Sequence, residues 1–251
     1  MTNDLTGRRA LVTGGGTGIG RATAIALAQA GADVALTYRS NDGTPVAEEI
    51  QAMGRKSVAL ALNAIDQGEV DSVLAAATEA LGGPIDLLVN NAGGLVGRQK
   101  LAEMTDEHWF AVVDVNLTST FRVTRAVLQQ MPDGGSIVTI GSQAAENGGG
   151  PGAVAYAASK SALEGFTRGL AKELGPRNIN VNVIAPGFIG GTPFHATFTP
   201  EAGQQAAVAG TPLGRAGQPD DIANAVAYLV SPGGSFVTGI VMDINGGNWF
   251  R

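Results

Sequence analysis

The sequence predicts an α/β fold of the Rossmann type, in which helices cover both faces of one doubly wound parallel sheet. Short apolar runs alternate with longer Ala-rich segments along the whole chain, as in a series of βα units. The runs at residues 34–37 and 85–89 lack polar alternation, which is typical of strands buried on both faces. No Pro/Ser-rich linker divides the 251 residues. A single domain over residues 1–251 is therefore expected.

The elements follow one another in strict βα order, which right-handed crossovers turn into a doubly wound sheet. Strands are expected at residues 10–12, 34–37, 57–62, 85–89, 136–140, 179–184 and 240–244. Helices are expected at residues 18–30, 45–53, 69–81, 109–131, 155–174 and 220–229. Gly31, Gly54 and Gly82 follow the first three helices, where glycine commonly ends a helix.

Residues 187–212 break this rhythm, because they are rich in Gly, Pro and Thr and contain no clear strand. A segment of that length in a compact domain is often functional. We therefore expect a small substrate lid at residues 187–212.

Composition excludes several classes of protein. The chain has 16 basic and 22 acidic residues, a net charge of −6, so no nucleic-acid partner is expected. It has no Cys, and His108 and His195 are its two histidines, so disulfides, thiolate centres and a metal site are not expected. No apolar run suits a signal peptide or a membrane span. A cytoplasmic protein without membrane contact is the expectation.

A glycine-rich loop, TGGGTGIG at residues 13–20, joins the first strand to the first helix. Gly14, Gly18 and Gly20 would allow positive φ angles and close approach of phosphates, which a helix N-terminus also favours. The spacing therefore indicates a dinucleotide site, and a purely steric strand-to-helix turn is the alternative.

The end of the second strand bears on the choice of dinucleotide. A carboxylate there would bind a ribose 2′-hydroxyl, whereas a basic residue would accommodate a 2′-phosphate. Arg39 is the nearest charge in the sequence Tyr38-Arg39-Ser40-Asn41-Asp42, which favours NADP(H). NAD(H) stays possible if Asp42 reaches the site or if Arg39 is only a solvated surface charge.

Three residues suggest proton transfer. Tyr156 and Lys160 are four apart in an expected helix, so they share one face. The ammonium would lower the pKa of the phenol from about 10, which suits general acid–base catalysis. Ser142 follows the strand at residues 136–140, and its hydroxyl could donate to the same carbonyl oxygen. An exposed Tyr-Lys helix pair is the alternative.

The order of these motifs resembles the short-chain dehydrogenase/reductase family over essentially the whole chain. The matching residues are TGGGTGIG at 13–20, NNAG at 90–93, Asn116, Ser142, YAASK at 156–160 and PG at 186–187. The resemblance implies that Tyr156 is the general acid/base and that Lys160 binds the nicotinamide ribose. It also implies that Ser142 orients the carbonyl and that Asn116 supports a proton-relay water.

The same resemblance implies a set of cofactor contacts, with the glycines at the pyrophosphate, Asn63 at the adenine and the Ile189 backbone at the carboxamide. The expected cofactor residues are Gly14, Thr17, Gly18, Ile19, Gly20, Arg39, Asn63, Asn90, Ala92, Gly93, Tyr156, Lys160, Pro186, Gly187 and Ile189. Thr192 stands one residue later than the family's usual Thr, and the glycine loop lacks the basic residue that NADP members often carry. The first departure concerns the contact of Thr192 with the cofactor, and the second leaves use of either NADP(H) or NAD(H) open.

The substrate is less defined. Much of the chain looks like a 3-oxoacyl-ACP reductase, but residues 93–98, 147–152 and 192–195 resemble loops in reductases of 4-deoxy-L-erythro-5-hexoseulose uronate, a keto-sugar acid of alginate metabolism. Glycine turns would offer free N–H groups, and Arg98 could pair with a carboxylate. The expected substrate residues are Arg98, Ser142, Gly150, Tyr156 and His195. A solvated Arg98 and a His195 that only packs in the lid are the alternatives.

We therefore expect an NAD(P)H-dependent reductase of this small keto-sugar acid. A 3-oxoacyl-ACP reductase and a non-catalytic dinucleotide-sensing protein are the alternatives. The family resemblance also implies a homotetramer or homodimer, with residues 109–131 and 155–174 packed across one two-fold axis and residues 245–251 near another.

Overall fold

Seven parallel strands form one sheet in the computed structural model, which describes residues 4–251. The strand order is β3-β2-β1-β4-β5-β6-β7. The strands are β1 (Arg9–Val12), β2 (Asp33–Tyr38), β3 (Ser57–Ala61), β4 (Leu87–Asn90), β5 (Ser136–Ile140), β6 (Asn180–Pro186) and β7 (Val241–Ile244). This arrangement confirms the predicted doubly wound α/β fold. The expected domain covers residues 1–251, and its residues 1–3 lie outside the described residues.

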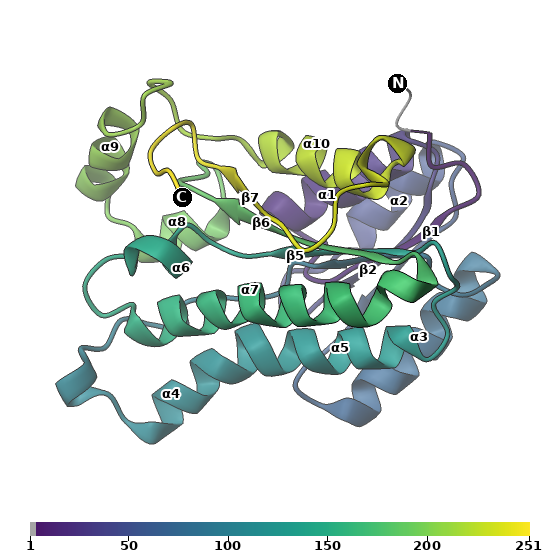
Figure 1. Ribbon diagram of the computed structural model, residues 1–251, viewed down its shortest axis with the longest axis horizontal. Coiled ribbons are helices and arrows are strands. Elements are labelled where there is room, and N and C mark those ends of the chain that lie inside the picture. The colour runs from purple at the N-terminus through teal and green to yellow at the C-terminus, as the bar shows by residue number, and fades with distance from the viewer. Residues whose placement is uncertain (1–3) are drawn as a thin grey trace.

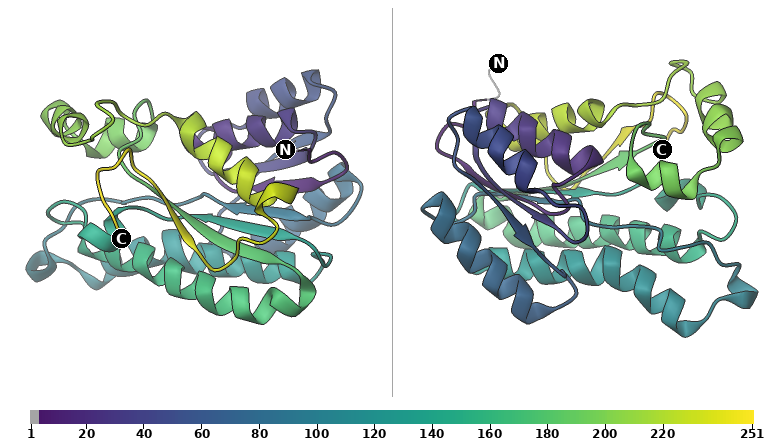
Figure 2. Two further views of the ribbon diagram at one scale, coloured as in Figure 1. Left: turned by 45° about the horizontal axis from the view of Figure 1, so that its top comes forward. Right: turned by 180° about the vertical axis from the view of Figure 1, so that it is seen from behind.

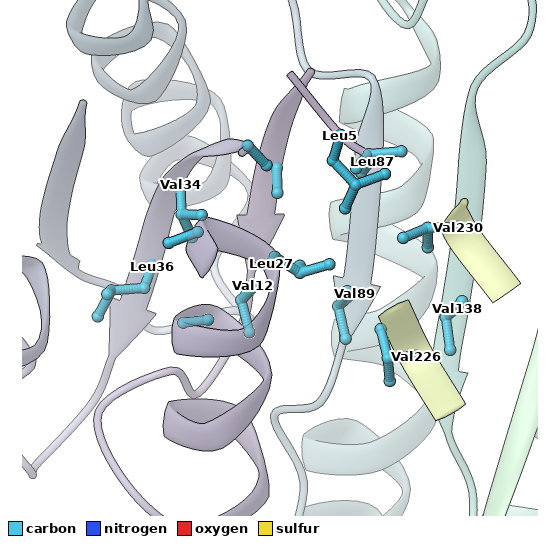
Figure 3. Packing of buried hydrophobic residues seen from close by; sticks show 14 of the residues in the cluster. Leu5, Val12, Leu27, Val34, Leu36, Leu87, Val89, Val138, Val226 and Val230 are labelled. Carbon is cyan, nitrogen blue, oxygen red and sulfur yellow. The ribbon is translucent and has the colours of Figure 1, made fainter. Parts of the chain in front are cut away.

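Helices cover both faces of the sheet, as Figures 1 and 2 show. On one face lie α1 (Gly18–Gln29), α2 (Thr44–Ala52) and α10 (Pro219–Val230), and on the other lie α3 (Gln67–Leu81), α5 (Ser119–Leu128) and α7 (Val154–Leu174). In Figure 3, Leu27 of α1 and Val226 of α10 pack near the strand residues Val12 and Val89, and all four side chains are buried. The strands are apolar on both faces because both faces are covered.

The order in which the chain adds strands reverses at β1: β2 and β3 lie on one side of it, and β4 to β7 lie on the other. Leu11 of β1 pairs with Ala35 of β2 on one side and with Leu88 of β4 on the other. The loops after neighbouring strands diverge at such a point and leave a crevice outside the carboxyl ends, where open α/β sheets bind ligands.

The expected helix at residues 109–131 begins earlier and is interrupted. Thr105 caps α4 (Asp106–Val113) by accepting a hydrogen bond from the His108 amide. A π-helical turn at Asp114–Thr118 then separates α4 from α5, and the Thr120 hydroxyl donates to the Asn116 carbonyl there. Such turns frequently occur at functional sites.

The segment at residues 187–212 contains two short helices that the sequence did not predict. These are α8 (Pro193–Phe198) and α9 (Glu201–Ala209), and Thr192 caps α8. A further helix, α6 (Ala144–Asn147), follows β5. Figure 1 shows α6, α8 and α9 at the same end of the molecule. Within residues 4–251, no helix is both long and apolar enough to cross a membrane.

Candidate active site

A cavity of about 550 Å³ extends along the carboxyl ends of the strands, from the glycine loop to the lid. Most of the expected site residues line it: Gly14, Thr17, Gly18, Ile19, Gly20, Arg39, Asn63, Ala92, Gly93, Arg98, Ser142, Gly150, Tyr156, Lys160, Pro186, Gly187, Ile189 and His195. Asn90 and Asn116 are not among the lining residues. No group of three metal-binding side chains occurs in the part of the chain that the structure describes.

The glycine loop fits a dinucleotide pyrophosphate. Gly14 and Gly18 have φ angles of +65° and +52°, and a Cβ atom on Gly20 would lie 2.1 Å from the Gly14 carbonyl oxygen. Thr17 precedes α1 without a side-chain cap, and the first turn of α1 carries no acidic residue. The amides at the start of α1 are therefore available for an anion.

Asn91 holds this loop, whereas the resemblance implied that Asn90 lines the cofactor cleft. The Asn91 side-chain amide donates to the carbonyl oxygens of Thr13 and Gly14 at 2.9 and 3.0 Å. The Asn90 amide instead donates to the Thr124 hydroxyl of α5 at 2.9 Å. Alternate side chains of a strand point to opposite faces, so the prediction that Asn90 lines the cleft is wrong. The NNAG motif identified the region but not which Asn faces the cavity.

Arg39 is exposed and lines the adenosine end of the cavity with Ser40 and Asn41. Asp42 is not a lining residue, because its carboxylate accepts hydrogen bonds from the Thr44 amide and hydroxyl at 2.9 and 2.7 Å. These bonds lower the pKa of Asp42. The Asp42 carboxylate is thus bonded to Thr44, the first residue of α2. It does not face the cavity, where it could have bound the ribose 2′-hydroxyl of NAD(H).

Ser142, Tyr156 and Lys160 meet in the middle of the cavity. Ser142 and Tyr156 both line the cavity, and the Ser142 hydroxyl is close enough to influence the Tyr156 phenol. Lys160 is buried one helical turn from Tyr156, and its Nζ donates to the Ile140 carbonyl at 2.8 Å. The Lys160 Nζ lies 5.8 Å from the centre of the Tyr156 ring. The predicted constellation is therefore present in space.

The electrostatics differ from the prediction. Burial raises the pKa of the Tyr156 phenol, and the neighbouring Ser142 hydroxyl opposes this only in part. Burial also lowers the pKa of Lys160 to about 8. The expectation that Lys160 lowers the pKa of Tyr156 is therefore wrong for this structure, because both groups are desolvated and burial dominates.

Asn116 supports the site from behind. Its side-chain oxygen accepts from the Gly94 amide at 3.0 Å, and its amide donates to the carbonyls of Gly94 and Val112 at 2.8 Å each. A Cβ atom on Gly93 would lie 2.7 Å from this oxygen and 3.3 Å from the Lys160 Nζ. Asn116 thus joins the loop after β4 to the π-helical turn, beside Lys160. Its role in a proton relay stays a prediction.

The lid presents aromatic side chains to the catalytic residues. The ring of Phe194 in α8 lies 5.9 Å from that of Tyr156. His195 packs edge-on against Phe188 and Phe194, at 4.6 and 5.0 Å between ring centres. Its Nδ1 bonds with the Thr199 hydroxyl at 2.9 Å, and burial lowers its pKa. His195 therefore has a packing role that the sequence analysis held as the alternative.

Two further residues at the rim have structural partners. Arg98 is exposed, and its Nη1 donates to the Pro151 carbonyl at 3.0 Å, which joins two loops around the cavity. Thr192 lines the cavity although it is shifted by one residue, and its methyl group would lie 3.5 Å from a Cβ atom on Gly18. The start of the lid therefore rests against the glycine loop.

A doubly wound sheet, an anion-binding glycine loop and a Tyr and a Ser beside a buried Lys define an NAD(P)-dependent oxidoreductase. A family model described as enoyl-(acyl carrier protein) reductase matches residues 14–248. The chain belongs to the short-chain dehydrogenase/reductase family.

Relatives match almost the whole chain. It is 42% identical over 246 residues to the 3-oxoacyl-(acyl-carrier-protein) reductase FabG of Pseudomonas aeruginosa, covering 97% of this chain and 98% of the relative. It is 41% identical to the enzyme of that name from Escherichia coli, covering 96% and 97%.

Two solved structures are also similar. A short-chain dehydrogenase from Burkholderia cenocepacia in complex with NADP has a TM-score of 0.91 and 37% identity, covering 97% of this chain and 98% of that chain. A blue fluorescent protein from a metagenomic library in complex with NADPH has a TM-score of 0.92 and 39% identity, covering 98% and 100%. These similarities identify an enzyme family and do not support a resemblance to uronate reductases.

Proposed function

We propose that the protein is an NADPH-dependent reductase that converts a 3-oxoacyl thioester to the 3-hydroxyacyl thioester. The observation that carries the proposal is that Ser142 and Tyr156 line one cavity beside buried Lys160 and beneath an aromatic lid. The relatives named as 3-oxoacyl reductases support this substrate class over the keto-sugar acid.

The residues around the cavity have distinct roles in this reaction. Bound NADPH supplies the hydride for the carbonyl carbon. The Ser142 hydroxyl donates a hydrogen bond to the substrate oxygen and orients it. Tyr156 donates its proton to that oxygen, and its raised pKa keeps the phenol protonated until then. Lys160 binds the nicotinamide ribose from the floor of the cavity.

The lid favours an apolar substrate beyond the reacting carbon. Phe188, Phe194 and Phe198 form an aromatic group with His195, and Phe194 faces Tyr156. An acyl chain would gain from contact with Phe194, the phenylalanine of this group that lines the cavity, whereas the hydroxyls of a sugar acid would lose water there without compensation. Arg98 at the rim is the observation that keeps the keto-sugar acid as a second candidate.

A steady-state assay with NADPH tests the substrate. We expect a higher kcat/KM for acetoacetyl thioesters than for 4-deoxy-L-erythro-5-hexoseulose uronate. Phe194→Ala should raise KM for the thioester, and Arg98→Ala should leave it nearly unchanged. A preference for the uronate, together with a large loss in Arg98→Ala, would overturn the substrate proposal.

The cofactor proposal depends on Arg39. Its exposed guanidinium would pair with the 2′-phosphate of NADPH, while Asp42 is engaged with Thr44. Arg39→Ala should weaken NADPH binding by roughly tenfold, the range of one charge-assisted hydrogen bond, and leave NADH binding unchanged. Equal weakening of both cofactors in a fluorescence titration would refute this role.

We also propose that the protein forms a homo-oligomer, as the sequence resemblance implies, and that it acts in the cytoplasm. Phe110, Phe121 and Val154 are 59%, 41% and 42% exposed on α4, α5 and α7. Apolar side chains on neighbouring helices suit a protein interface. Sedimentation velocity should detect a dimer or tetramer, and a monomer at all concentrations would refute the proposal.

A further inference from the structure

Arg251 lies beyond β7 and connects three structural elements through one guanidinium group. Its Nε donates to Asp243 of β7 at 2.9 Å, and its Nη2 donates to Glu164 of α7 at 2.9 Å. Its Nη1 donates to Glu146 of α6 and to the second oxygen of Glu164. Figure 1 shows this end of the chain beside α6.

Helix α7 carries Tyr156 and Lys160, and α6 begins two residues after Ser142. Helix α6 is built on Ser142, because the Ala144 amide donates to the Ser142 hydroxyl at 3.1 Å and the Ala145 amide to its carbonyl at 3.0 Å. Glu164 stands four residues after Lys160 in α7, so it continues the face that carries Tyr156 and Lys160. Arg251 therefore joins the support of Ser142 to the helix of Tyr156.

Among the described residues, no other cation lies close enough to Glu164 to take the place of Arg251. The Glu164 side chain is 7% exposed, and Arg168 approaches it only to 3.7 Å from a side chain that is 57% exposed. Without Arg251, three carboxylates from three elements would face one another, and the buried one would lose its close donors. A planar guanidinium can serve several carboxylates at fixed angles, whereas an ammonium is a single point charge.

We propose that Arg251 is a positioning residue, which holds α6 against α7 so that the Ser142 and Tyr156 hydroxyls keep their mutual geometry. The kinetic consequence depends on the reductase activity proposed above, but the structural consequence does not.

The kinetic test compares Arg251→Ala with Arg168→Ala, which removes the exposed partner of the same Glu164. We expect kcat to fall roughly tenfold in Arg251→Ala, as for a small misplacement of reacting groups, with KM for NADPH nearly unchanged. Arg251→Lys should recover part of kcat, and Arg168→Ala should keep wild-type kcat. A wild-type kcat in Arg251→Ala would overturn the proposal. A loss of kcat that is fully explained by a lower thermal unfolding midpoint of the variant would also overturn it.

Hydrogen exchange tests the same proposal without turnover. Amides of Ala144 and Ala145 should exchange faster in Arg251→Ala, while amides of α1 should not change. Glu146→Gln should produce a smaller effect at the same amides, and the double variant should exchange no faster than Arg251→Ala alone, because one contact is removed in both. Unchanged exchange at α6 would overturn the proposal. An inactive wild type with faster α6 exchange in Arg251→Ala would refute the proposed function and support this one.

Discussion

Replacing Lys160 by Met should stabilise the fold while impairing the enzyme. The Lys160 pKa falls from 10.5 to about 8 because the ammonium is buried. That difference corresponds to about 3 kcal/mol of unfavourable free energy for the charged form in the folded protein. Met removes this penalty but also the bond from Nζ to the Ile140 carbonyl, worth about 1 kcal/mol. The free energy of unfolding at neutral pH should rise by about 2 kcal/mol.

The higher free energy of unfolding of Lys160→Met should disappear at alkaline pH. Between pH 8 and 10.5 the unfolded chain keeps a proton on Lys160 that the folded protein has lost, so the stability of the wild type rises with pH. Lys160→Met lacks this titration, and its advantage should approach zero near about pH 10. Urea unfolding at both pH values measures the difference, and NADPH-dependent turnover should be lost.

Lys172→Met is the matched control, because Lys172 is exposed on the same helix. It should change the free energy of unfolding by less than about 0.5 kcal/mol at either pH. If Lys160→Met is less stable than the wild type at neutral pH, or if its effect does not depend on pH, then burial is not what lowers the pKa of Lys160.

Three other substitutions test separate parts of the site. Tyr156→Phe should lower kcat by about 10²-fold to 10⁴-fold, the range of general acid catalysis, with the NADPH dissociation constant nearly unchanged; normal turnover would refute the proton-donor role. Asn91→Ala removes two hydrogen bonds to the glycine loop, so NADPH binding should weaken roughly tenfold in a fluorescence titration. Gly20→Ala would place a Cβ atom 2.1 Å from the Gly14 carbonyl oxygen, so NADPH binding should be lost. Gly165→Ala in α7, where nothing lies within 4 Å of the added Cβ, should bind NADPH normally.

The sheet could be predicted from the sequence because its strands are short, continuous apolar runs. Residues 136–140 were predicted as a strand with the bounds that β5 has. The helices α6, α8 and α9 were missed because they are short, with four, six and nine residues. The π-helical turn was also missed, since its five residues continue a helical segment and barely change the apolar pattern.

The catalytic residues were predictable from motif order, but their energetics were not. Ser142, Tyr156 and Lys160 meet as expected, whereas the direction of the Tyr156 pKa shift depends on burial, which spacing does not reveal. The side chain that faces the cavity at residues 90–91 depends on where β4 ends. Arg98 and His195 have partners in nearby loops that no local motif indicates.

The central position of β1 has a consequence for biosynthesis. During synthesis, β2 follows β1 after one helix and can pair with it on one side. The partner on the other side, β4, is synthesised only after α2, β3 and α3. Until then, one backbone edge of β1 and the apolar side chains around it have no cover. A nascent or truncated chain that stops before β4 would expose this edge to other polypeptides. Such fragments should aggregate and engage chaperones, whereas chains that have completed the β1–β4 ladder should not.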